Sequence, residues 1–253
     1  MLEAHDGEGP EPLGSGPYFR RLVNSWGLEL RAWSTRAMPL LMLDLDNTLV
    51  DRDAAFRDAA AALLAEHALP ESGIAWLMSV DASGYTPRQS VADAIAERYG
   101  PALPVSAVHA LLDRGGADRV VLSEAVRDAL GRAVAEGWSC VIVTNGPTAQ
   151  QEEKIRNAGL DALVHGWVIS EKAGHKKPAP EIFLAAAATT GASLDGAWVI
   201  GDSPRADIAG ADGIGVRSVW VSGGHPWTET DYRPTLVADD TASAIHHVIR
   251  TPR

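Results

Sequence analysis

The sequence predicts a doubly wound, Rossmann-like α/β fold, in which helices cover both faces of a parallel sheet. Short aliphatic runs recur along the chain and end in polar residues, a pattern that is typical of buried parallel strands. Segments with helical spacing of apolar residues lie between most of these runs, so strands and helices alternate. A long stretch after the first run breaks the alternation and contains helical patterns only, which predicts an inserted α-helical cap domain.

Five strands and three connecting helices are predicted for the core. The helices lie at 123–137, 148–159 and 179–191, and the first begins at a capping serine and closes at a glycine. Ligands of such folds bind at the carboxyl ends of the strands, so functional residues are expected there. The predicted strands are 40–45 (LLMLDL), 139–145 (SCVIVTN), 163–170 (LVHGWVIS), 197–202 (AWVIGD) and 216–222 (VRSVWVS).

The stretch that breaks the alternation has helical patterns at 53–68, 87–99 and 105–114. Extra helices packed on the sheet would explain it, but we favour a cap, because the insertion begins where the candidate catalytic residues end. Whether the first residues belong to the natural chain stays open, since Met38 directly precedes the first strand. The predicted division is a core domain from 38–52 and 120–253, a cap domain from 53–119 and a partly disordered N-terminal extension from 1–37.

Charge and composition restrict the partners. The formal net charge is -11, which repels nucleic-acid phosphates and anionic lipid. A phosphorylated small molecule is repelled too, so any phosphate site must supply its own positive charge. The single cysteine, Cys140, cannot form an internal disulfide, and no apolar run is long enough to span a bilayer. These observations predict a cytoplasmic protein without a nucleic-acid or membrane partner, and leave monomer or homodimer open.

Acidic residues gather at the ends of two predicted strands. Asp44 and Asp46 end the first strand and Asp202 ends the strand at 197–202, with Asp207 soon after. Carboxylates this close repel each other unless a cation lies between them. Because parallel strand ends meet at one edge of the sheet, these residues offer several hard oxygen ligands, which suit Mg²⁺ rather than zinc. Harmless clustering at the surface, and a helix-start role for Asp207, are the alternatives.

Two further loops supply hydrogen-bond donors and positive charge. Thr144 and Asn145 end the second strand beside a flexible glycine and can donate to a phosphate. Lys176 and Lys177 precede a helix with a proline at its first turn, and a lysine here would supply the positive charge that the composition lacks. Each loop alone is a weak signal, because ordinary turns and solvated lysine pairs have the same sequences.

The four loops together resemble the haloacid dehalogenase superfamily, in the form of a phosphatase with a helical cap inserted after the first motif. DLDNT resembles the first family motif, VTNG the second, KKP the third and GDSPRAD the fourth. The resemblance covers about residues 39–250. It implies a Mg²⁺-dependent phosphomonoesterase that acts on a small phosphorylated metabolite through an aspartyl-phosphate intermediate.

The resemblance also assigns roles in the reaction. Asp44 would be the nucleophile, and Asp46 would protonate the leaving group and later activate water. Thr144 and Asn145 would hold the phosphoryl oxygens. Lys177, with Lys176 as the fallback, would offset charge on the nucleophile and the phosphate.

The remaining acidic residues would hold the metal and support the site. Asp202 would complete the Mg²⁺ shell with Asp44 and the backbone carbonyl of Asp46. Asp207 would orient the lysine, and Ser203 would support the metal as an outer ligand.

Three points stay open: the class of reaction, the effect of Asn47 in the first loop, and the residues of the cap that contact the substrate. Family dehalogenases lack the second aspartate, so Asp46 favours a phosphatase; a phosphotransferase such as a sugar-phosphate mutase, and a non-catalytic regulatory protein, stay open. Asn47 stands where many relatives have Gly, and Asn also tolerates unusual backbone angles. Substrate contacts are expected from Arg52, Tyr85 and Arg88, although a solvated arginine is an equally good interpretation of Arg52.

Overall fold

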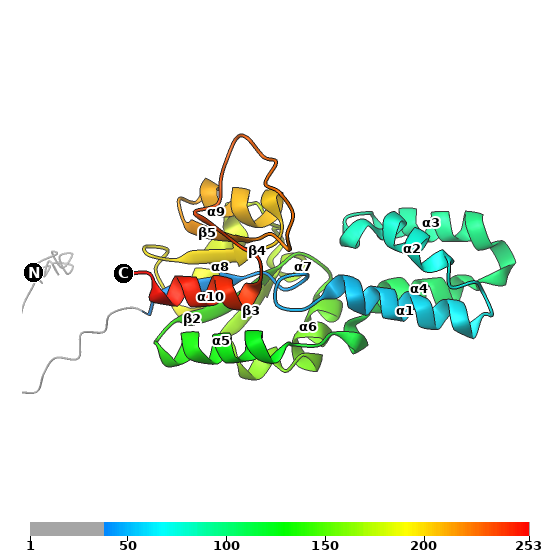
Figure 1. The fold of residues 1–253 in the computed structure, drawn as a ribbon, viewed down its shortest axis with the longest axis horizontal. Coiled ribbons are helices and arrows are strands. Elements are labelled where there is room, and N and C mark those ends of the chain that lie inside the picture. Colours follow the sequence, from blue (N-terminus) through cyan, green and yellow to red (C-terminus); the bar gives the residue numbers. More distant parts are fainter. Residues whose placement is uncertain (1–37, 253) are drawn as a thin grey trace, which may run out of the picture. The chain divides into compact units, whose positions relative to one another are not determined.

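The computed structural model describes residues 38–252, so the predicted N-terminal extension at 1–37 lies outside the described residues. A six-stranded sheet forms the core (Figure 1), and its strand order is β3-β2-β1-β4-β5-β6. Every neighbouring pair is parallel, which confirms the predicted fold class. The strands are β1 (Leu40–Leu43), β2 (Ser139–Thr144), β3 (Gly166–Ile169), β4 (Trp198–Gly201), β5 (Arg217–Val221) and β6 (Leu236–Ala238).

β1 lies in the middle of the sheet, where it pairs with both β2 and β4. All four of its residues are buried, because both faces of the strand are covered. The chain builds β1 to β3 on one side and then returns across β1 to build β4 to β6. The strand order therefore reverses between β1 and β4, and ligands of open α/β sheets bind in the crevice beyond such a reversal.

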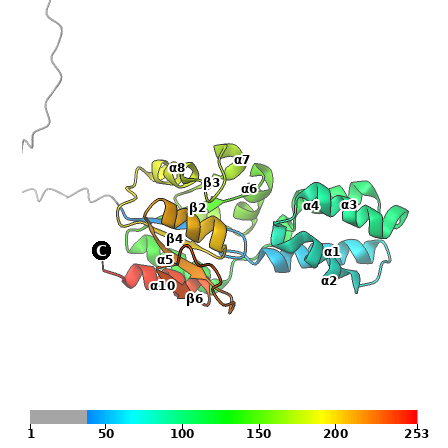
Figure 2. The ribbon, with the colours of Figure 1, turned by 90° about the horizontal axis from the view of Figure 1, so that it is seen from above.

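Helices pack on both faces of the sheet (Figure 2). Because successive side chains of a strand point to opposite faces, Leu41 and Leu43 pack in one hydrophobic cluster, whereas Leu40 and Met42 pack in another. The first cluster includes buried residues of α5 (Glu124–Ala135), α6 (Thr148–Asn157) and α10 (Thr241–Arg250). The second includes buried residues of α8 (Pro180–Thr190) and α9 (Ala209–Gly213). A short helix, α7 (Ser170–Ala173), follows β3.

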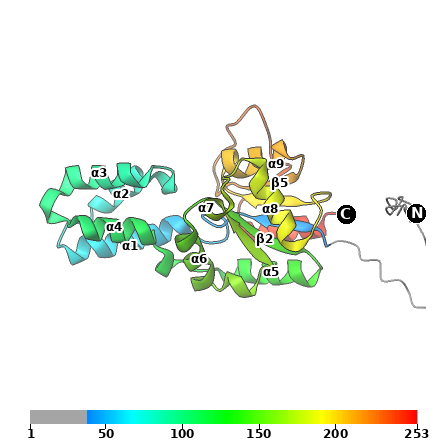
Figure 3. The same cartoon turned by 180° about the vertical axis from the view of Figure 1, so that it is seen from behind.

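Four helices separate β1 from α5 and lie together in both views from the side (Figures 1 and 3). They bury a hydrophobic cluster of their own, which includes Phe56, Leu64 and Leu77. The first helix begins after Asp51, whose carboxylate accepts a hydrogen bond from Ala54 N at 2.8 Å. These helices are α1 (Arg52–Glu66), α2 (Gly73–Asp81), α3 (Arg88–Tyr99) and α4 (Val105–Arg114).

The described chain contains four elements that the sequence patterns do not predict: α2, α7, β6 and α10. The sequence of α2 (GIAWLMSVD) has almost no polar face, so its helical period is hidden. β6 has three residues at the sheet edge. Short helical turns complete the described structure, with 3₁₀ geometry at 82–84, 100–102, 117–119 and 160–162 and π geometry at Pro204–Ile208. None of the described helices is both long and apolar enough to cross a membrane.

Candidate active site

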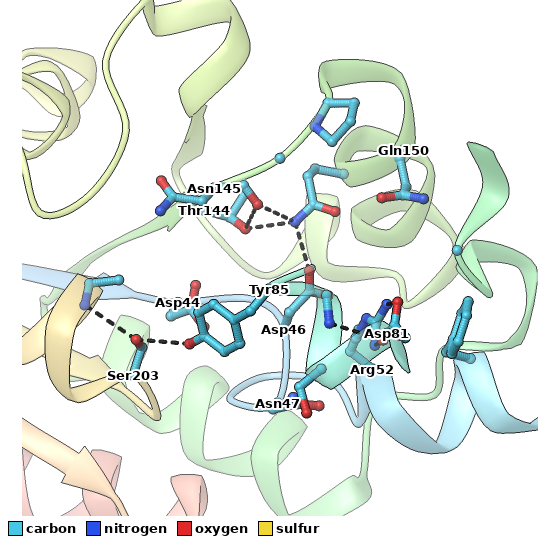
Figure 4. Close-up of a pocket in the computed structure, with 18 of the residues that line it drawn as sticks. Asp44, Asp46, Asn47, Arg52, Asp81, Tyr85, Thr144, Asn145, Gln150 and Ser203 are labelled. Atoms are coloured by element: carbon cyan, nitrogen blue, oxygen red, sulfur yellow. Dashed lines mark hydrogen bonds and ion pairs between the residues drawn. The ribbon is translucent and has the colours of Figure 1, made fainter. Parts of the chain in front are cut away.

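A pocket of about 340 Å³ lies beyond the carboxyl ends of β1, β2 and β4 (Figure 4). The loops that follow these strands form one part of its wall, and the inserted helices form the rest. The structure thus brings the four predicted loops and the predicted cap contacts to one place. The predicted residues that line the pocket are Asp44, Asp46, Arg52, Tyr85, Arg88, Thr144, Asn145, Lys177, Asp202, Ser203 and Asp207.

Lys177 lies between two of the carboxylates. Its Nζ is 2.5 Å from Asp44 Oδ1 and 2.7 Å from Asp207 Oδ1, and all three side chains are buried. Burial by itself lowers the pKa of a lysine, but the charges of Asp207 and Asp44 outweigh burial and raise the pKa of Lys177 above its usual value. The ammonium therefore stays charged. Lys176, the fallback for this position, is exposed.

Asp202 adds a third carboxylate to this group. One oxygen from each of Asp44, Asp202 and Asp207 lies within 4.8 Å of the others. Burial, followed by repulsion from Asp44 and Asp207, raises the pKa of Asp202 to about 9. Within residues 38–252, Lys177 is the only side chain that forms an ion pair with any of the three. Hard oxygen donors with excess negative charge fit a divalent cation such as Mg²⁺.

Asp207 is held by both of its carboxylate oxygens. Oδ1 accepts from Lys177, and Oδ2 accepts from Ser203 N at 3.1 Å. Burial raises the pKa of Asp207 to about 6 even though Lys177 opposes the shift. Gly201 allows this close packing, because a Cβ at that position would lie 2.2 Å from Asp207 Cγ. β4 can therefore approach the turn that carries Asp207 only with a glycine at its end.

Thr48 and Asn47 shape the loop after β1. Thr48 Oγ1 lies 3.2 Å from Asp44 Oδ2, and Asp202 N donates to it at 3.1 Å, so this hydroxyl joins the first and fourth loops. Asn47 has a φ of 57°, in the left-handed region that Asn tolerates better than most residues. The expected tolerance of Asn at this position is confirmed.

Asn145 connects the second loop to the third. Its Oδ1 accepts from Lys177 N at 2.8 Å, and its Nδ2 donates to Lys177 O at 3.1 Å. The amide group is thus engaged with the backbone of the lysine. The hydroxyl of Thr144 accepts from Gln151 Nε2 at 2.7 Å, which leaves its own hydrogen with one long contact of 3.5 Å to Asn145 O.

Two residues of α6 reach Asp46, and the sequence patterns do not single them out. Lys154 Nζ lies 2.7 Å from Asp46 Oδ1 and 2.8 Å from Oδ2, and Gln151 Nε2 donates to Oδ2 at 3.0 Å. In a sequence, a buried glutamine or lysine on a helix looks the same as one on the solvent-exposed face. The signal that was available is the helical spacing of Gln151 with Ile155 and Ala158, which places a polar residue within an apolar stripe.

The inserted helices contribute side chains that are already partnered. Arg52 is buried and pairs with Asp81, with a second contact to Asp53 at 3.0 Å. Burial lowers the pKa of Arg52, but the bonds with Asp81 outweigh it and raise the pKa. Tyr85 Oη donates to Ser203 Oγ at 2.9 Å, and Figure 4 shows the Tyr85 ring reaching from the inserted segment to the loop after β4.

Comparison with known proteins points to one family. The model of haloacid dehalogenase-like hydrolases matches residues 38–215. The phosphoserine phosphatase of Thermus thermophilus is 34% identical over 111 residues, which cover 44% of this chain and 45% of that protein. The glyceraldehyde 3-phosphate phosphatase of Pyrococcus furiosus is 36% identical over 45% of this chain and 47% of its own. The chain thus spans about half the length of these relatives.

Other known proteins match a larger share of the chain at a lower sequence identity. Phosphoglycolate phosphatase 1 of Pseudomonas aeruginosa is 29% identical over 82% of this chain and 79% of its own length. Among solved structures, the putative HAD-hydrolase YfnB of Bacillus subtilis, bound to magnesium, superposes with a TM-score of 0.68 over 85% of this chain and all of its own, at 22% identity. That likeness shows the fold. With its family model matched across most of its length, the chain belongs to the haloacid dehalogenase-like hydrolases.

Proposed function

We propose that this chain is a Mg²⁺-dependent phosphomonoesterase that hydrolyses a small phosphorylated metabolite through an aspartyl-phosphate on Asp44. The observation that carries the proposal is the division of the carboxylates: Asp44 lies beside Lys177 and Asp202, whereas Asp46 is held separately by Lys154. Three of the curated relatives are named for phosphatase activity on phosphoserine, glyceraldehyde 3-phosphate and phosphoglycolate, which supports the class of substrate.

The reaction has two halves. In the first, an Asp44 oxygen bonds to phosphorus while the bond from phosphorus to the leaving oxygen breaks, and Asp46 gives a proton to that oxygen. In the second, water attacks the phosphorus of the aspartyl-phosphate, Asp46 takes a proton from the water, and inorganic phosphate leaves Asp44 free. Lys177 offsets the negative charge that Asp44 and the phosphoryl group bring together.

The oxygen cluster suits the metal that this chemistry needs. Asp44, Asp202 and the backbone carbonyl of Asp46 would hold Mg²⁺, which screens the repulsion between a carboxylate nucleophile and an anionic phosphate. Asp207 orients Lys177, and Ser203 N fixes Asp207. The hydroxyl hydrogen of Thr144 has only a long contact of 3.5 Å to Asn145 O, so it could turn to a phosphoryl oxygen, whereas Asn145 acts by holding the Lys177 backbone.

The inserted helices would act as the cap domain that selects the substrate. Their own hydrophobic cluster supports this role, as do Arg52, Tyr85 and Arg88 in the pocket wall. Because Arg52 already pairs with Asp81, its charge is mostly neutralised, and it would not hold a second anionic group of the substrate unless Asp81 gave way.

The test is a phosphate-release assay on a panel that contains phosphoserine, glyceraldehyde 3-phosphate, phosphoglycolate and nucleoside monophosphates, each with Mg²⁺ and with EDTA. Asp44→Asn is expected to abolish release, and the exposed carboxylate variant Asp58→Asn is the matched control. Turnover that survives both EDTA and Asp44→Asn would show the mechanism to be wrong. An isomerised phosphate ester as product would favour a mutase, and no turnover on any substrate would favour a non-catalytic protein.

A further inference from the structure

Lys154 is an unusual residue for a helix that packs on a sheet. Only 2% of its side chain is exposed, although lysines are almost never fully buried unless they are paired. Within residues 38–252 its single ion-pair partner is Asp46, and it contacts both oxygens of that carboxylate, at 2.7 and 2.8 Å. Asp46 itself is half-buried and lines the pocket. The pair therefore joins the interior to the wall of the site.

Gln151 completes the contact from the same side of α6. Residues three apart on a helix lie on one face, and Gln151 donates from Nε2 to Asp46 Oδ2, with Thr144 Oγ1 and Asn145 O also within reach of that nitrogen. The Asp46 carboxylate and the Asn145 carbonyl oxygen can only accept hydrogen bonds, so the nitrogen of the Gln151 amide must face them. Gly146 leaves room for Gln151, because a Cβ there would lie 3.1 Å from Gln151 Cδ.

A purely structural explanation of Lys154 is weak. An apolar side chain of similar volume would join α6 to the first loop without the desolvation that burial of an ammonium costs. The two buried lysines instead serve different carboxylates: Lys177 contacts Asp44 and Asp207, whereas Lys154 contacts Asp46 alone. A carboxylate held at both oxygens from the interior has a fixed plane and a fixed position at the pocket surface.

We propose that Lys154, assisted by Gln151, is a positioning residue that holds the Asp46 carboxylate where it exchanges a proton with the leaving oxygen. The role rests on the proposed function, in which Asp46 protonates that oxygen while its bond to phosphorus breaks. Lys154 acts through Asp46 and does not itself touch the reacting atoms. Its loss would therefore matter most where the leaving oxygen cannot depart without a proton.

Leaving-group dependence tests this role. The value of kcat/KM is measured for an alkyl phosphate from the active panel and for p-nitrophenyl phosphate, whose leaving group departs as an anion. Lys154→Met is expected to lower kcat/KM for the alkyl ester by roughly tenfold to a hundredfold, the cost of a misplaced catalytic group, with a much smaller loss for the aryl ester. Lys154→Arg, which keeps the charge, is expected to restore most of the alkyl activity.

A double-mutant cycle separates positioning from packing. In an Asp46→Asn background, Lys154→Met should change the alkyl-to-aryl ratio no further, because the group through which it acts is gone. Arg156→Met is the matched control on the same helix, since Arg156 is also a cation paired with a carboxylate, that of Glu152 at 2.6 Å, but is exposed and does not line the pocket. It should leave the ratio as in the wild type.

The outcomes distinguish this role from the proposed function. The positioning role alone is overturned if the wild type is active and Lys154→Met lowers kcat/KM equally for the alkyl and the aryl ester. It is also overturned if Lys154→Met lowers the alkyl-to-aryl ratio of kcat/KM by the same factor in the Asp46→Asn background as in the wild type. A wild type that is inactive on both ester classes overturns the proposed function and the role of Lys154 with it.

Discussion

At the residue scale, the adjacent lysines Lys176 and Lys177 have opposite environments. Lys177 is buried between Asp44 and Asp207, whereas Lys176 is exposed. We expect Lys177→Met to lower the free energy of unfolding by about 3–5 kcal/mol, because it leaves buried carboxylates without their cation. Lys176→Met should change it by less than about 0.5 kcal/mol. Urea unfolding of the metal-free protein measures both, and equal effects would contradict the buried network.

Cys140 is predicted to be chemically inert in the folded protein. Its thiol is buried in β2, and burial raises its pKa to about 12. Since the thiolate is the reactive form, iodoacetamide at pH 8 should label Cys140 only when denaturant is added. Mass spectrometry of the native and unfolded protein checks this, and rapid labelling of the native form would show that β2 is accessible.

At the element scale, the contact between β4 and the turn after it depends on Gly201. Gly201→Ala would bring Cβ to 2.2 Å from Asp207 Cγ, so Asp207 must move. Overpacking of this kind costs about 1–3 kcal/mol, and the proposed phosphatase activity should fall with the loss of Lys177 orientation. Gly131→Ala is the control, because a Cβ there meets nothing within 4 Å inside α5. It should stabilise the helix by up to about 1 kcal/mol, measured by thermal unfolding.

The N-cap residue of α10, Asp240, predicts that the stability of the protein depends on pH. Asp240 accepts from Ser243 N at 2.8 Å, and this bond lowers the pKa of Asp240 below its usual value. The stabilisation is thus complete above the unfolded value and is lost as the pH falls through the lowered pKa. Asp240→Ala should cost about 1 kcal/mol at pH 7 and less at pH 2, where more of the carboxylate is protonated, whereas Asp240→Asn should keep a cap that does not titrate. Chemical unfolding at both pH values distinguishes the variants.

Local patterns predicted most elements but only part of the site. Buried runs such as LLML have one interpretation, and β1 and β2 begin at the predicted residues. α2 was missed because an apolar helix has no visible period, and β6 because its three residues form a strand only beside β5. Lys154 was missed for a related reason: its burial depends on Asp46, which lies 108 positions away in the sequence.

At the scale of the whole molecule, metal binding should couple to stability. The Asp44–Asp202–Asp207 cluster carries excess negative charge, so Mg²⁺ that binds the folded state should raise the melting temperature. At a hundred times its dissociation constant, the ion should add about 2.7 kcal/mol to the free energy of unfolding. Asp202→Asn should remove this gain and stabilise the metal-free protein, because it replaces a carboxyl whose pKa is raised to about 9 by burial and by Asp44 and Asp207. Thermal unfolding across a Mg²⁺ titration tests both, and an unchanged Mg²⁺ response in the variant would place the ion elsewhere.

The hydrogen bond from Tyr85 to Ser203 has a consequence for how often this side of the pocket is open. A neutral hydrogen bond contributes about 1 kcal/mol, which corresponds to about a fivefold preference for the bonded arrangement. Separation of Tyr85 from Ser203 is then a frequent thermal event rather than a rare one. The fraction of molecules in which this side of the pocket is open would accordingly depend on this bond, and Tyr85→Phe would raise that fraction.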